Sequence, residues 1–183
     1  MRSGTDYVAF FRNVNLGQRG GPTKAQLERA FRQAGAATAA SFLSNGTLIF
    51  SVWDESRHQA LVQRARRILQ EWCGLQEPAF CRSLQHLGDL IRGDPFAEHD
   101  APAIAGRFVS FFDPSIANAI ALPLESKTGD CTVFQIVAGD AFSVTQRVAG
   151  RTGYPTPVLE RALKTPVTTR GWETIRRLVS RCA

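Results

Sequence analysis

The chain has 183 residues, of which 44% are hydrophobic and 21% are charged, and its formal net charge at pH 7 is +6. So many apolar side chains can bury a full core, which excludes intrinsic disorder and removes the need for a disulfide framework. No apolar run reaches the roughly 20 residues that cross a bilayer, and residues 1–15 lack a signal-peptide pattern. We therefore expect a cytoplasmic protein with no membrane partner.

Charge is distributed unevenly along the chain. Residues 1–92 carry a net charge of +5, residues 93–146 carry −5, and residues 147–183 carry +6. Basic flanks of this kind attract phosphate-bearing partners, and they equally let one half of a protein dock on the other. An ordinary solvated surface explains the pattern most simply.

The cysteines and histidines have no spacing that is typical of a metal site or a catalytic set. The four cysteines form no CxxC pair, and the three histidines do not cluster with them. The sequence also lacks GxSxG and HExxH motifs. We therefore expect reduced, packed thiols, no metal and no cofactor. An enzyme remains an alternative without an assigned reaction or catalytic residue.

The first half predicts alternating strands and helices. The segment Tyr7–Asn15 begins with apolar residues and then becomes polar, which predicts a strand that leaves the core near Arg12. A helix ending at Gly35 follows, and the turn signal Asn45-Gly46 predicts a hairpin. A second helix ending at Gly74, a short strand and a closing helix complete the β-α-β-β-α-β plan of ferredoxin-like folds.

The second half repeats this order of elements. Its predicted elements are a strand at 107–112, a short helix at 114–122, two β-rich runs within 131–148 joined by a hairpin at 138–140, a helix near 156–163, a short strand near 165–170 and a helix near 172–182. We therefore predict an α+β fold that duplicates two ferredoxin-like subdomains. Their predicted bounds are 1–93 and 107–183, with a Pro-, Ala- and Gly-rich linker at 94–106.

Four segments resemble motifs of one bacterial family. They are YVAFFRNVNLGQRGG, SFLSNGTLIF, DPF and TPVTTRGWETIRRLV, which resemble the family patterns YVAFLRGVNVGG, TYIQSGNVVF, NPF and ATARNWRTVLKL. The chain is thus similar, over nearly its whole length, to the DUF1697 family, a bacterial domain of unknown function. This resemblance implies an α+β protein with two related halves, and it implies no activity, cofactor or catalytic residue.

The chain departs from the family pattern at polar positions. Residues 154–157 read Tyr-Pro-Thr-Pro where the family usually carries a Ser-Lys pair, and Arg170 is followed by Gly171 where the family has Arg-Asn-Trp. The family's Ser-Gly-Asn appears here as Ser-Asn-Gly at residues 44–46. If those polar residues form a binding site in relatives, this chain has altered or lost it.

A glycine-rich loop is the first candidate binding segment. The run NLGQRGGPTK contains three glycines directly before a predicted helix, whose first N–H groups and dipole favour anions. Arg12, Arg19 and Lys24 would add positive charge to this site. The loop matches neither GxGxxG nor GxxxxGK[ST], so it predicts no nucleotide motif, and a plain surface turn remains the alternative.

A second expectation concerns loops that leave equivalent strand ends in the two halves. Such loops can share one face, so we expect Arg170 to join four residues of the first half in a polar patch between the halves. The predicted ligand-binding residues are, in full, Arg12, Asn13, Asn15, Arg19, Lys24, Asn45 and Arg170.

The sequence therefore predicts a module that binds a small molecule or an anion, without naming the ligand. A nucleic-acid-binding protein that uses the basic flanks is the first alternative, because RFVSFF at residues 107–112 resembles part of an RNP1 run. Core packing explains these aromatic residues better. A monomer and a dimer both remain open, since exposed sheet edges can pair within one chain or between two.

Overall fold

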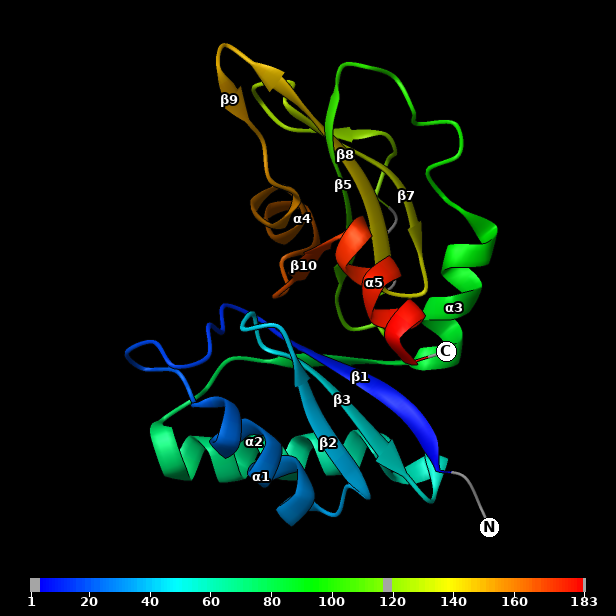
Figure 1. The fold of residues 1–183 in the computed structure, drawn as a ribbon. Coiled ribbons are helices and arrows are strands. Elements are labelled where there is room, and N and C mark those ends of the chain that lie inside the picture. The colour runs from blue at the N-terminus through cyan, green and yellow to red at the C-terminus, as the bar shows by residue number, and fades with distance from the viewer. Residues whose placement is uncertain (1–3, 117–119, 183) are drawn as a thin grey trace. The chain divides into compact units, whose positions relative to one another are not determined.

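The structure is a computed structural model that describes residues 4–116 and 120–182. It is an α+β fold whose described residues form two antiparallel sheets and five α-helices (Figure 1). The chain divides into two compact units, residues 1–88 and residues 89–183. Within the two described ranges, no helix is both long enough and apolar enough to cross a membrane.

The first unit packs two helices on one face of a four-stranded sheet (Figure 1). Its elements are β1 (Thr5–Phe11), α1 (Lys24–Ala34), β2 (Thr38–Phe42), β3 (Thr47–Val52), the 3-10 turn η1 (Glu55–Arg57), α2 (His58–Cys73) and β4 (Ala79–Ser83), followed by α3 (Leu84–Gly93) across the unit boundary. The strand order is β2-β3-β1-β4, and every neighbouring pair is antiparallel. The predicted elements of the first half are therefore confirmed.

Local sequence explains where these helices begin and end. Thr23 and Gln26 form a capping box at the start of α1, in which each side chain accepts a hydrogen bond from the other residue's backbone N–H group. Gly35 ends α1 in the left-handed conformation and Gly74 ends α2 in the same way. The apolar face of α1 and alternate residues of the central strand β1 meet in one buried core.

The predicted hairpin between β2 and β3 is confirmed, but its turn is wider than a two-residue Asn-Gly turn. Phe42 pairs with Thr47, so the loop contains residues 43–46. Positive φ angles occur at Leu43 (61°) and Gly46 (69°) and not at Asn45. The side-chain oxygen of Asn45 instead accepts a hydrogen bond from the Thr47 hydroxyl at 2.8 Å.

The second unit is built around a larger antiparallel sheet. Its elements are β5 (Ile104–Phe111), β6 (Leu124–Glu125), β7 (Cys131–Val137), β8 (Asp140–Val148), β9 (Arg151–Thr152), α4 (Pro155–Leu163), β10 (Thr168–Gly171) and α5 (Trp172–Cys182). The strand order is β10-β5-β8-β7-β6, and β9 pairs with β8. The hairpin predicted at 138–140 is confirmed as a tight turn, with positive φ at both Ala138 (49°) and Gly139 (85°).

Helices cover both faces of this second sheet. Leu159 and Leu163 of α4 pack with Ala141, whereas Trp172 of α5 packs edge-on against Phe142. Adjacent strand residues point to opposite faces, so the two helices lie on opposite sides of β8. Phe96, within the predicted linker, is also buried against Phe142 and Trp172.

The two sheets have corresponding strand orders, but the predicted duplication of a ferredoxin-like unit is not confirmed. If β5, β7, β8 and β10 are equated with β1, β2, β3 and β4, both orders agree. In the chain, however, β6 comes between β5 and β7, and in the sheet it adds an edge strand next to β7. The predicted short helix at 114–122 includes residues 117–119, which lie outside the described residues, and the rest of that segment is not helical. β5 also begins at Ile104 rather than at Arg107.

Candidate functional site

A cavity of about 490 Å³ opens in the first unit beyond the end of β1. The glycine-rich loop forms one wall, and the segment between α2 and β4 forms the other. The lining residues are Asn13, Val14, Asn15, Gln18, Arg19, Gly20, Gly21, Gly74, Leu75, Gln76 and Glu77. Most of the side chains that are longer than glycine are amides or charged groups.

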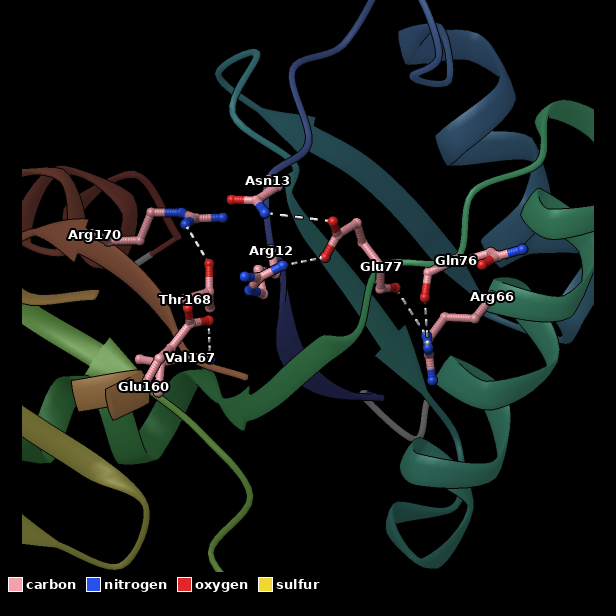
Figure 2. Close-up of polar contacts among 9 residues, drawn as sticks. All are labelled: Arg12, Asn13, Arg66, Gln76, Glu77, Glu160, Val167, Thr168 and Arg170. Atoms are coloured by element: carbon pink, nitrogen blue, oxygen red, sulfur yellow. Dashed lines mark hydrogen bonds and ion pairs between the residues drawn. The ribbon is translucent and has the colours of Figure 1, made fainter. Parts of the chain in front are cut away.

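Glu77 holds the end of β1 at the rim of this cavity (Figure 2). The guanidinium of Arg12 donates to one carboxylate oxygen of Glu77 at 2.9 Å, and the Asn13 amide donates to the other at 3.4 Å. The Arg12 and Glu77 side chains are only 25% and 31% exposed, so water screens their attraction less than that of a fully exposed pair. Asn13 has a φ of 50°, a left-handed conformation that asparagine tolerates well.

Arg66 of α2 supports the opposite wall. Its Nε atom donates to the backbone oxygen of Glu77 at 3.2 Å, and a terminal nitrogen approaches the backbone oxygen of Gln76 at 3.5 Å (Figure 2). Its other terminal nitrogen donates to the Gln63 side chain at 2.9 Å. The segment that carries Glu77 is thereby tied to α2, which places the carboxylate firmly.

Backbone hydrogen bonds hold the β2–β3 hairpin loop against the end of β1 and the start of the glycine-rich loop. The Phe11 N–H group donates to the oxygen of Gly46 at 2.9 Å, and the Leu16 N–H group donates to the oxygen of Ser44 at 2.7 Å. A Cβ atom at Gly46 would lie 2.8 Å from the Cβ atom of Val14, which is closer than real Cβ contacts allow. Glycine is therefore required for the hairpin to approach the first lining residues.

Fewer backbone N–H groups of the glycine-rich loop are available to bind an anion than the loop sequence predicts. Gly17, Gln18 and Gly21 donate their N–H groups to carbonyl oxygens inside the loop, at 3.0 to 3.3 Å. The capping box also uses the N–H groups of Thr23 and Gln26. A bound anion would therefore depend mainly on side chains, of which the exposed Arg19 guanidinium is the cation that lines the cavity.

The cavity brings together four of the predicted site residues. Asn13, Asn15 and Arg19 line it, and Arg12 is connected to it through Glu77. Two other predicted residues of this unit do not line it. Lys24 lies 3.9 Å from the Glu28 carboxylate one helical turn away, and Asn45 is engaged within the hairpin loop.

Arg170, the remaining predicted residue, lies in β10 of the second unit and is buried. It donates to the Thr168 hydroxyl at 2.8 Å (Figure 2). It also donates to the backbone oxygen of Thr169 at 2.9 Å. Burial lowers the pKa of Arg170 to about 10, against the opposing effect of Tyr154. The predicted convergence of Arg170 with residues of the first half stays a prediction.

A row of hydroxyl groups lies beside Arg170 on β10 and its neighbours. The Thr169 hydroxyl is 2.7 Å from the hydroxyls of both Ser110 and Thr156. The Glu160 carboxylate of α4 accepts a hydrogen bond from Val167, just before β10, at 3.0 Å (Figure 2). These contacts tie β10 to β5 and α4, which gives the cluster a clear structural role.

The family follows from the sequence match. The model described as "Protein of unknown function (DUF1697)" matches residues 5–142. The chain belongs to this family. The resemblance to this family is therefore confirmed over residues 5–142.

A solved structure supports the fold of this DUF1697 chain. The conserved bacterial protein SP0830 from Streptococcus pneumoniae superposes with a TM-score of 0.71 and 18% identity, over 97% of this chain and 98% of that one. At this identity, the likeness shows a shared fold alone. A search of the curated proteins finds no significant match. The comparisons therefore indicate no specific function for this DUF1697 protein.

Three other features of this DUF1697 structure bear on its chemistry. Burial raises the pKa of the Cys81 thiol to about 12 and that of Cys131 to about 11, so neither thiol is a ready nucleophile near neutral pH. No group of three or more His, Cys, Asp or Glu side chains is placed to hold a metal ion within the described part of the chain. Phe111 and Phe112 of the RNP1-like run are buried, as core residues are.

Glu77 is the residue of the candidate site that sequence reasoning missed. It lies 65 residues from Arg12, and no motif marks it. A topological signal was available, because β4 pairs antiparallel with β1 and Ala79 faces Phe11. In this antiparallel pair, residues just before β4 lie beside residues just after β1.

Proposed function

We propose that this DUF1697 chain binds a small anionic molecule rich in hydroxyl groups, of the sugar phosphate class, in the cavity beyond β1. The observation that carries the proposal is the combination of Arg19, several side-chain amides and Glu77 around one space of about 490 Å³. Ligand pockets are commonly about 300 to 1,000 Å³, so the space suits a molecule of this size.

The chemistry of the lining favours this ligand class. A guanidinium pairs with phosphate through charge-assisted, often bidentate hydrogen bonds, which supports a phosphate near Arg19. Amides offer both donors and acceptors, and a carboxylate accepts from hydroxyl groups, which supports a polyol near Asn15, Gln76 and Glu77. The lining residues named above include no aromatic side chain, which disfavours a nucleobase.

The test is a titration of the full chain with glucose 6-phosphate, with glucose and inorganic phosphate as partial probes. A ligand that binds only the folded protein raises its melting temperature, and NMR shifts locate the affected amides. We expect shifts at residues 13–21 and 74–77. Arg19→Gln should weaken binding about ten- to a hundred-fold, since hydrogen bonds to charged groups contribute about 1.5 to 3 kcal/mol.

Arg67→Gln is the matched control, because Arg67 is an exposed arginine of α2 outside the cavity. It removes the same charge and should leave affinity nearly unchanged. If both variants lose the same ligand affinity, the effect comes from net charge and not from the cavity. Unmoved amides throughout the two loop segments would remove the proposal.

We also infer that the two units are variants of one ferredoxin-like plan. The corresponding strand orders, and a closing helix directly after both β4 and β10, support this inference. The test is the backbone chemical shifts of residues 113–123 in solution. Helical shifts would supply the crossover helix that the plan requires, whereas extended shifts throughout would count against the repeat.

A further inference from the structure

A second cavity in the first unit, of about 410 Å³, lies apart from the glycine-rich loop. It lies where the end of α1, the end of β3 and the first turns of α2 meet. Its lining residues are Ala34, Gly35, Val52, Trp53, Asp54, Arg57, Ala60, Leu61 and Arg64, and together they define the Trp53 groove.

Trp53 is the most unusual residue of this groove, because its side chain is 67% exposed. Tryptophan normally gains much stability from burial, so a ring that stands in water offers a large surface for stacking. The backbone on both sides of Trp53 is held in place. Trp53 directly follows β3, whose last residue Val52 is buried, and Asp54 caps the next turn by accepting from the Ser56 N–H group at 3.0 Å.

Two arginines stand on the α2 side of the groove. Arg64 lies on α2, Arg57 ends the 3-10 turn directly before that helix, and both line the groove. Ala34, Gly35 and Ala60 also line the groove, and these small residues leave room for a ligand.

The groove carries a surplus of positive charge. Arg57 pairs with Asp54 at 3.2 Å, and both side chains are largely exposed. Among the described residues, Arg64 has no acidic partner. One guanidinium is therefore left to compensate an incoming anion next to an exposed aromatic ring.

We propose that the Trp53 groove binds a mononucleotide, with its base stacked on Trp53 and its phosphate paired with Arg64 and Arg57. Stacking on an aromatic ring accepts every base, and guanidinium groups bind phosphate through charge-assisted hydrogen bonds. The volume suits one nucleotide. Asp54, which lines the groove, and Glu55, which follows it, interrupt the continuous line of cations that the backbone of a nucleic acid strand requires. This site is independent of the sugar phosphate cavity.

The experiment is a titration of the full chain with AMP and with UMP, followed by tryptophan fluorescence and by the indole N–H signals in NMR. Adenosine and inorganic phosphate serve as partial probes. We expect both nucleotides to shift the Trp53 indole signal, and each partial probe to bind at least ten-fold more weakly. Trp53→Ala and Arg64→Gln should each weaken AMP binding about ten-fold or more.

A matched variant separates this site from general effects. Arg67→Gln removes a charge from the same helix outside the groove and should leave AMP affinity unchanged. Trp53 and Arg64 are exposed, so both variants should keep the circular dichroism spectrum of the parent chain. Arg64→Gln, on an exposed helix surface, tests the site even if the tryptophan variant folds poorly.

Three results would overturn the proposal. The first is an AMP affinity that is unchanged in both Trp53→Ala and Arg64→Gln. The second is inorganic phosphate binding as tightly as AMP, which would remove the role of the ring. The third is binding of a single-stranded oligonucleotide with no measurable binding of mononucleotides, which would make the surface a nucleic acid site.

Discussion

Replacing Gly46 by alanine tests how the β2–β3 hairpin positions the glycine-rich loop. The new Cβ atom would lie 2.8 Å from the Cβ atom of Val14 and 3.0 Å from that of Phe11. Both contacting atoms are attached directly to the backbone, so they cannot rotate away. The substitution therefore has to displace either the hairpin loop or the chain that leaves β1.

Two costs add at this position. A non-glycine residue in the left-handed region, here at a φ of +69°, costs about 1 to 2 kcal/mol. Overpacking a well-filled site costs about 1 to 3 kcal/mol more. We therefore expect Gly46→Ala to lower the free energy of unfolding by about 2 to 5 kcal/mol, a large part of the 5 to 15 kcal/mol that is typical of a folded protein.

Gly35→Ala is the matched control. Gly35 also has a positive φ, of +110°, but an added Cβ atom there meets nothing within 4 Å. It should cost only the conformational term, about 1 to 2 kcal/mol. Urea unfolding followed by circular dichroism gives both values, and amide hydrogen exchange shows whether the loss is centred on β1 and β3. If the two variants differ by less than about 0.5 kcal/mol, the steric argument is wrong.

Three further predictions concern the same units. Leu43 is 48% exposed with a φ of 61°, so Leu43→Gly should stabilise the first unit by about 1 kcal/mol in urea unfolding. Glu77→Gln breaks the ion pair with Arg12 and should lower the free energy of unfolding by about 1 kcal/mol or less. In calorimetry, it should reduce the affinity for glucose 6-phosphate by a larger proportion than it reduces stability. Hydrogen bonds from the Ser126 and Thr128 hydroxyl groups lower the pKa of the Asp130 carboxyl group. The stabilisation from these hydrogen bonds is thus present above the unfolded pKa of Asp130 and is lost as pH falls through its lowered folded pKa. Asp130→Asn should abolish this pH dependence of stability. If NMR shows Asp130 titrating at its unfolded pKa, this prediction is wrong.

Features that depend on neighbouring residues were predictable from the sequence. Gly35 and Gly74 end their helices because glycine adopts the left-handed cap at little cost, and Gly139 supplies a positive φ to the β7–β8 turn for the same reason. The exit of β1 near Arg12 follows from the change from apolar to polar side chains. Each of these signals lies within a few residues of the feature that it specifies.

The candidate site shows where this reasoning ends. The loop sequence predicted backbone donors for an anion, but internal hydrogen bonds and the Thr23 capping box use several of them. The sequence also predicted two similar halves, whereas in the second unit the short strand β6 follows the segment 114–122 where a helix was expected. Competing local partners and added edge strands are not visible in a pattern of apolar spacing.

The amino-acid sequence by itself determined the two α+β halves, the helix ends and the polar character of the loop beyond β1, because periodicity and glycine act over short stretches of chain. Only the tertiary structure decided that Glu77 meets Arg12 and that the exposed Trp53 shares a groove with two arginines. Those arrangements depend on which strands and helices lie side by side. Antiparallel pairing of β1 with β4 brings together residues that are 65 positions apart, and no local signal records that distance.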